Sequence, residues 1–136
     1  MIGGKALCRG LVLGGILAFG LGCGRGDLPE LGYVSGTVTM DGKPLSGAIV
    51  EFHSEAGGRP GVGVTDAEGH YELNYTGGVE GSKVGPATIS ITTEWPEGEP
   101  PEGESEKIPP KYNSKTILKE TVEAGSNTFD FALESK

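Results

Sequence analysis

The side chains of this chain that could bind a metal ion or take part in catalysis are its histidines and its clustered carboxylates. His53 and His70 have no cysteine or further histidine at a metal-binding spacing, whereas a zinc site needs three or four converging ligands. Asp66 and Glu68 could offer oxygen atoms to calcium, but the further ligands of a calcium loop are missing, and Asp66 lies where a turn residue is expected. No stretch resembles a nucleophile elbow. We therefore expect no catalytic residue, no metal site and no cofactor, and predict that the protein is not an enzyme.

The first 22 residues have the pattern of an export signal. Lys5 and Arg9 give a positive start, and residues 11–21 form an uncharged apolar run. A helix of that length rises only about 16 Å, which is too short for a hydrocarbon core of ~30 Å, so a buried or membrane-spanning helix is the weaker alternative. A short apolar run behind a basic start is typical of a signal peptide.

The residues around Cys23 resemble the bacterial lipoprotein signal, in which a small residue precedes a cysteine that receives lipid and becomes the new N-terminus. The sequence reads Leu21-Gly22-Cys23-Gly24, with glycine at position 20 where that signal prefers leucine. Ordinary cleavage after residue 20 is the alternative. Cys8 would leave with the signal, so Cys23 would be the only cysteine of an exported protein, and lipidation accounts for such an unpaired thiol. Residues 1–22 are thus predicted to be a lipoprotein signal peptide, and Cys23 the anchor to a membrane of the cell envelope, on its periplasmic or surface face.

Residues 23–32 show no apolar periodicity and contain several glycines, so they are predicted to be a flexible tether ahead of one domain at residues 33–136. The formal net charge of the whole chain is −8. It becomes −10 without residues 1–22, which contain two basic residues and no acidic one. Proteins that bind nucleic acid need a basic surface, and we expect no nucleic-acid partner.

Residues 94–110 form an acidic, proline-rich segment, with six Glu and five Pro in seventeen residues. Proline interrupts sheet hydrogen bonding and like charges repel, so the segment is predicted to be an extended, mobile loop. Such long loops are often either functional or disordered. One interpretation is a solvated insertion; the other is a polyproline-type recognition segment that includes Pro100 and Pro101. Trp95, the only tryptophan, is expected to cap the edge of the core or else to stack on a partner or a sugar.

Alternation of apolar and polar residues predicts short strands throughout the domain, because strand side chains point to opposite faces in turn. Asp41-Gly42 is a turn signal, and residues 34–52 are expected to form a hairpin around it. With no helical periodicity, the pattern predicts an all-β fold, a seven-stranded β-sandwich, with a barrel as the alternative. The strands are expected at residues 34–40, 48–53, 61–65, 70–75, 87–93, 116–122 and 128–133, with a loop at 76–83. The expected inward-facing residues include Val34, Val38, Ala48, Val50, Phe52, Tyr71, Leu73, Tyr75, Ala87, Ile89, Ile91, Phe129, Phe131 and Leu133.

Six short motifs follow one another along the domain. They are Val34-Ser-Gly-Thr-Val, Asp41-Gly-Lys-Pro-Leu-Ser-Gly-Ala, Thr65-Asp-Ala-Glu-Gly-His-Tyr, Gly85-Pro-Ala-Thr-Ile-Ser-Ile, Ile108-Pro-Pro-Lys-Tyr and Asn127-Thr-Phe-Asp-Phe. The set resembles the carboxypeptidase regulatory-like, transthyretin-like domain, as found in small bacterial envelope lipoproteins. The resemblance covers most of residues 33–133 and implies a seven-stranded Greek-key sandwich.

The resemblance implies a folding or docking module rather than a catalyst. The hydrolase branch of the transthyretin-like fold carries a His and Arg site and ends Tyr-Arg-Gly-Ser, whereas this chain ends Phe131-Ala-Leu-Glu-Ser-Lys136. We therefore predict a non-catalytic, lipid-anchored envelope module for protein or glycan interaction or for structural spacing. The alternative is a small transthyretin-like hydrolase or ligand-binding protein.

Overall fold

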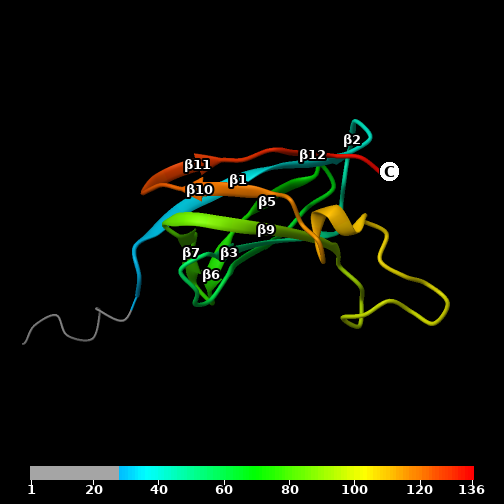
Figure 1. Cartoon of the computed structure of the whole chain (residues 1–136), viewed down its shortest axis with the longest axis horizontal. Helices are drawn as coiled ribbons and strands as arrows, with labels where there is room; N and C mark the ends of the chain where they lie inside the picture. The colour runs from blue at the N-terminus through cyan, green and yellow to red at the C-terminus, as the bar shows by residue number, and fades with distance from the viewer. Residues whose placement is uncertain (1–27) are drawn as a thin grey trace, which may run out of the picture.

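A computed structural model describes residues 28–136 (Figure 1). Their secondary structure is all-β: twelve strands and one short 3-10 helix, η3 (Pro110–Tyr112). The strands form two six-stranded sheets whose inner faces share one core. This confirms the predicted all-β class and two-sheet architecture. Within residues 28–136, no helix has the length and apolar character that crossing a membrane requires.

The first sheet is built around its longest strand, β1. The first half of β1 pairs in parallel with β11, and its second half pairs in parallel with β12. Antiparallel partners of β1 are β8 near its start, β5 at its middle and β2 at its end. The strands of this sheet are β1 (Leu31–Met40), β2 (Lys43–Pro44), β5 (His70–Glu72), β8 (Ser82–Lys83), β11 (Gly125–Thr128) and β12 (Phe131–Leu133).

The second sheet is antiparallel, in the order β10-β9-β3-β4-β6-β7. Its centre is the long pairing of β3 with β9, which runs from Ala48↔Thr93 to Ser54↔Ala87. The β-branched residues of β9 suit this position, because they pack well on a pleated surface. The strands are β3 (Ala48–Ser54), β4 (Gly61–Val64), β6 (Asn74–Thr76), β7 (Val79–Glu80), β9 (Gly85–Thr93) and β10 (Lys119–Val122).

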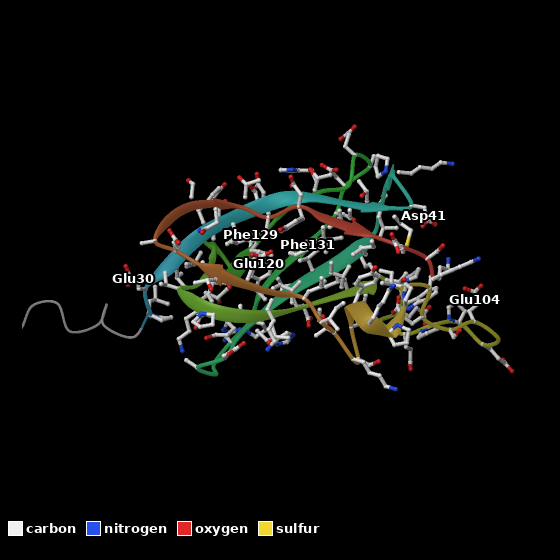
Figure 2. All side chains as sticks on the ribbon, turned by 45° about the horizontal axis from the view of Figure 1, so that its top comes forward. Glu30, Asp41, Glu104, Glu120, Phe129 and Phe131 are labelled. Carbon is white, nitrogen blue, oxygen red and sulfur yellow. The ribbon has the colours of Figure 1, made fainter. Side chains whose placement is uncertain are left out.

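The core lies between the two sheets, and aromatic rings join them. The Phe52 ring of β3 lies with its centroid 5.8 Å from that of Phe129 and 6.2 Å from that of Phe131. Tyr71 stacks on Phe131 at 6.3 Å. Figure 2 shows Phe129 and Phe131 near the middle of the molecule. Alternation correctly predicted most of the core: Val34, Val38, Ala48, Val50, Phe52, Tyr71, Leu73, Ala87, Ile89, Ile91, Phe131 and Leu133 are all buried. Tyr75 and Phe129 are half-buried.

Gly36 allows the C-terminal segment to approach β1 closely. A Cβ atom at this position would lie 1.9 Å from the carbonyl oxygen of Phe129, so only glycine fits. The same carbonyl accepts a hydrogen bond from the Tyr71 hydroxyl at 2.6 Å. Burial, followed by the charges of Asp130 and Glu120, raises the pKa of Tyr71 far above its ordinary value, so this hydroxyl stays a donor.

The hairpin expected over residues 34–52 is wrong in its second strand. The turn itself is present: Asp41 and Gly42 have φ of 53° and 84°, as a two-residue hairpin turn requires. In this hairpin β1 pairs with only the two residues of β2. The Leu45 N–H still donates to the Val38 carbonyl at 2.9 Å, but the Val38 N–H donates to the Gly69 carbonyl at 2.8 Å, so the segment that leads into β5 replaces β2 as the partner of β1. The chain then turns through Gly47, at φ 71°, and β3 joins the other sheet.

Other predicted boundaries also change. The strand expected at residues 70–75 divides at buried Leu73, since β5 pairs with β1 and β6 pairs with β4 of the other sheet. The loop expected at 76–83 contains β7 and β8. The strand expected at 116–122 begins only at Lys119. β1 begins at Leu31, inside the expected tether, where Gly32 packs so tightly that a Cβ would lie 2.2 Å from the Glu123 carbonyl oxygen.

Candidate functional site

The two histidines lie in different sheets. His53, on β3, is exposed, and its Nε2 lies 3.0 Å from Oε1 of Glu51. His70, on β5, is exposed, and its Nε2 lies 3.7 Å from Oε2 of Glu72. Within residues 28–136, the charged partner of each histidine is a glutamate of its own strand. Within residues 28–136, no three His, Cys, Asp or Glu side chains gather in a way that could hold a metal ion.

Asp66 has the turn role that the sequence predicts. Its Oδ1 accepts hydrogen bonds from the backbone N–H groups of Glu68 at 2.9 Å and His70 at 3.0 Å. The backbone N–H of Gly69, whose φ is 78°, donates to the Asp66 carbonyl at 2.9 Å. Asp66 thus fixes the connection by which the chain leaves β4 and enters β5 in the other sheet.

The acidic loop, residues 94–105, projects from one end of the domain, at the opposite end from Glu30 (Figures 1 and 2). Two turns shape it. The backbone N–H of Gly98 donates to the Trp95 carbonyl, and that of Glu104 donates to the Pro101 carbonyl, both at 2.9 Å. Gly98 and Gly103 have φ of 86° and 89°, which glycine adopts readily. The loop is therefore a pair of turns rather than one extended strand.

The two turns repeat a sequence unit. Pro-Glu-Gly-Glu occurs at residues 96–99 and again at 101–104. Each unit places two carboxylates beside a turn, and all four glutamates are exposed. Among the described residues, none of these four carboxylates is in an ion pair. Like charges so close together favour a positively charged or multivalent partner over a neutral one.

Pro100 and Pro101 both line a hollow on the surface of the acidic loop. It has a volume of about 390 Å³ and is lined by Pro96, Glu97, Glu99, Pro100 and Pro101. Three prolines and two glutamates line it, so its surface is partly apolar and partly acidic. Trp95 does not line this hollow.

Trp95 lies at the base of the loop and is half-buried. The ammonium nitrogen of Lys107 lies 5.1 Å from the centroid of its ring, within the range of a cation–π contact. Its indole N–H is buried and has no hydrogen-bond partner among residues 28–136. An unpaired buried donor is costly, so this N–H lowers the stability of the loop base rather than offering an accessible contact.

Glu106 holds the loop to the sheet. Its Oε2 accepts three hydrogen bonds: from Thr93 N at 2.9 Å, from Thr93 Oγ1 at 2.6 Å and from Ile108 N at 3.1 Å. Hydrogen bonds to a carboxylate are stronger than neutral ones, and three of them close the loop where β9 ends. The prediction that the whole of residues 94–110 is extended and mobile is therefore wrong from Glu106 onward.

The residues after Glu106 pack on the domain. Ile108 and Tyr112 are buried, and the Tyr112 hydroxyl accepts the backbone N–H of Glu134 at 3.0 Å. The Asn113 side-chain amide donates to the carbonyls of Ile91, Ile108 and Pro109 at 3.0, 3.1 and 3.1 Å. Rigid ends thus support an exposed loop, which is how binding loops are commonly arranged.

Sequence reasoning missed two features of this site. The Pro-Glu-Gly-Glu repeat could have been found by searching for internal periodicity. The hydrogen bonding of Glu106 to Thr93 had no sequence signal, because nothing in the sequence distinguishes Glu106 from the other five glutamates of residues 94–110. Cys23, the signal peptide at residues 1–22 and the first part of the tether lie outside the described residues.

Comparison of the chain with protein-family models, with curated proteins and with solved structures gave no match. The fold and the site therefore define the class of the protein by themselves: an all-β protein of two stacked sheets that carries a clasped, acidic, proline-rich loop.

Proposed function

We propose that this protein is a non-catalytic, lipid-anchored module of the cell envelope that presents the acidic loop to a protein or glycan partner. One observation carries the proposal: the described chain begins at one end of the domain, and the acidic loop projects from the other (Figure 1). An anchor at Cys23 would therefore leave the loop pointing away from the membrane. The lipid on Cys23 would supply the membrane contact, since several acyl chains at one residue give stable anchoring.

The geometry supports a spacer role as well. Residues 24–30, between Cys23 and β1, span at most roughly 25 Å when extended. β1 has ten residues and adds roughly 33 Å in the direction of the loop. The acidic loop would thus be held well clear of headgroups, whose negative surface would repel it.

We further propose the finer fold assignment, a seven-stranded Greek-key sandwich of the carboxypeptidase regulatory-like, transthyretin-like kind. The six sequence motifs support it, and so does their placement. The Asp41-Gly42 motif forms the β1–β2 turn, the Thr65–Tyr71 motif forms the crossing from β4 to β5, and the Asn127–Phe131 motif carries the strands that pair with β1.

Fractionation of a bacterium that processes lipoproteins tests the anchor. The full chain should be recovered with membranes, and Cys23→Ser should move it to the soluble fraction. Cys8→Ser is the matched control and should leave it with membranes, because that cysteine departs with the signal. A wild-type chain that is already soluble would contradict the proposal.

Photo-crosslinking in intact cells tests the loop. A photoreactive residue replaces Glu102, in the loop, or Ser126, which is exposed on β11 and pairs with Tyr33 near the start of β1. A discrete adduct is expected from position 102 and not from position 126. Equal adducts at both positions, or none at 102, would remove the loop from the proposal.

A further inference from the structure

Asn74 on β6 lies in an acceptor sequence for N-linked glycosylation. Residues 74–76 read Asn-Tyr-Thr, which is the Asn-x-Ser/Thr pattern with no proline at the middle position. Glu72 lies two residues before Asn74, and an acidic residue there is the added requirement of bacterial oligosaccharyltransferases. Neither Asn113 nor Asn127 is followed two residues later by serine or threonine, so position 74 is the only such sequence in the chain.

The structure places Asn74 where a glycan can attach. Asn74 and Glu72 are exposed, while Leu73 between them is buried in the core. Asn74 pairs with Val62 of β4, so both side chains stand on the outer face of the second sheet. β6 is three residues long, and its pairing with β7 shifts register between Asn74 and Thr76. The acceptor thus lies in a short, irregular strand near the margin of the sheet.

The surface beside Asn74 has an apolar floor that nothing else in the described chain covers. A shallow hollow of about 560 Å³ is lined by Val62, Gly63, Val64, Asp66, His70, Glu72 and Asn74. Val64 is one of four large apolar side chains that the described domain leaves exposed, at 43%. Gly63 lets the backbone at Glu72 come close to β4 beside the hollow, because a Cβ there would lie 2.4 Å from the Glu72 carbonyl oxygen. A sugar ring joined to Asn74 could lie over Val62 and Val64, with its hydroxyls near Asp66 and Glu72.

We propose that Asn74 is an N-glycosylation site whose first sugar packs on the Val62–Val64 surface. The proposal rests on the export that the proposed function includes, because the enzyme works on the outer side of the membrane. It adds a covalent glycan on one face of the second sheet, away from the acidic loop.

The transfer is a substitution at the anomeric carbon of a polyprenyl-diphosphate-linked oligosaccharide. The side-chain amide nitrogen of Asn74 attacks that carbon and a C–N bond forms. The bond between the anomeric carbon and the diphosphate oxygen breaks, and its electron pair leaves with the polyprenyl diphosphate. The amide nitrogen gives up one proton to a base of the enzyme, and nothing is oxidised or reduced.

Mass spectrometry of the exported protein tests the assignment. The full chain carries an established export signal in place of residues 1–22, so that export no longer depends on the proposed leader. It is produced with a bacterial oligosaccharyltransferase and its lipid-linked glycan, and bears an appended Asp-Gln-Asn-Ala-Thr sequence as an internal control. Wild type should gain two glycans, and Asn74→Gln only the one on the appended sequence.

Further variants separate recognition from folding. Thr76→Ser should keep the glycan on Asn74, whereas Thr76→Val and Glu72→Gln should lose most of it at unchanged protein yield. If the first sugar packs on this surface, the glycan should raise the melting temperature of wild type, and Val64→Ser should leave attachment intact but remove that gain. Glycosylation of the appended sequence without glycosylation of Asn74 would overturn the inference, and so would a second glycan that persists in Asn74→Gln. Neither result bears on the Cys23 anchor, which fractionation tests separately.

Discussion

Replacing Glu106 by alanine tests whether the acidic loop is clasped to the sheet. The change removes three hydrogen bonds, from Thr93 N, Thr93 Oγ1 and Ile108 N to the same carboxylate oxygen. Hydrogen bonds to charged groups contribute about 1.5–3 kcal/mol each. The three share one oxygen in a half-buried site that water can reach, so they do not add fully. We expect a loss of about 2–4 kcal/mol in the free energy of unfolding.

Urea unfolding of residues 28–136 measures this loss. The midpoint should fall at unchanged m-value, since the same surface is exposed on unfolding. The melting temperature should fall by about 8–16 °C, given roughly 4 °C per kcal/mol for a domain of this size. Glu104→Ala is the matched control: it removes the same charge two residues away, within the acidic loop, and should change stability by less than about 0.5 kcal/mol.

A deletion variant separates the contribution of the three Glu106 hydrogen bonds, which we call the clasp, from that of the acidic loop itself. Removing residues 97–104 keeps Trp95, Glu106 and everything that Glu106 binds. Shortening a flexible loop changes its closure entropy only slightly, so stability should stay within about 1 kcal/mol of wild type. If Glu106→Ala costs no more than Glu104→Ala, or if the deletion unfolds the domain, the described clasp is wrong.

Four further substitutions, one of them a control, test the fold. Phe131→Ala should cost about 3–5 kcal/mol in urea unfolding, because the ring is 5% exposed and packs against Phe52 and Tyr71; a cost under about 1 kcal/mol would contradict the two-sheet core. Gly36→Ala should cost about 3 kcal/mol or more, since its Cβ would meet the Phe129 carbonyl. Gly98→Ala, with positive φ but open space, should cost only about 1 kcal/mol; equal costs would refute the close approach at Gly36. The pKa of Asp41 is lowered by hydrogen bonds from Ser135, so this carboxylate contributes stability that is present above its ordinary pKa of 3.8 and is lost as the pH falls through the lowered value. Asp41→Asn should therefore lose less stability than wild type when the pH falls from 5 to below 3.8. An unchanged dependence of stability on pH would contradict the hydrogen bonds between Ser135 and Asp41.

Much of the core could be predicted from sequence, because alternation is a local property. Val38, Val50, Ile89 and Phe131 face inward for the same reason, and each is at most 5% exposed. Strand pairing could not be predicted in the same way. Thr37 N donates to Asp130 Oδ1 across 93 residues, and no local pattern specifies such a contact. The division of residues 70–76 between two sheets is likewise set by distant strands, because β5 pairs with β1 in one sheet and β6 pairs with β4 in the other.

The candidate site was predictable in composition but not in arrangement. The proline and glutamate content of residues 94–110 is visible in the sequence, and so is the lone tryptophan at the start of the segment. The packing of Ile108 was hidden because it follows a proline-rich, charged stretch, whereas the aromatic ring of Tyr112 is an expected anchor for the chain that returns from the loop, and it is buried. The buried indole N–H of Trp95 and the position of the Lys107 ammonium over its ring are tertiary features that only the structure gives.

The N-terminus of the mature protein is the most direct test of the anchored-module account. Mass spectrometry of protein extracted from the membranes of a lipoprotein-processing bacterium would read it. We predict a chain that starts at Cys23, with the added mass of a diacylglyceryl group on the sulfur. A chain that starts at Leu21, or one with an unmodified Cys23, would contradict the account.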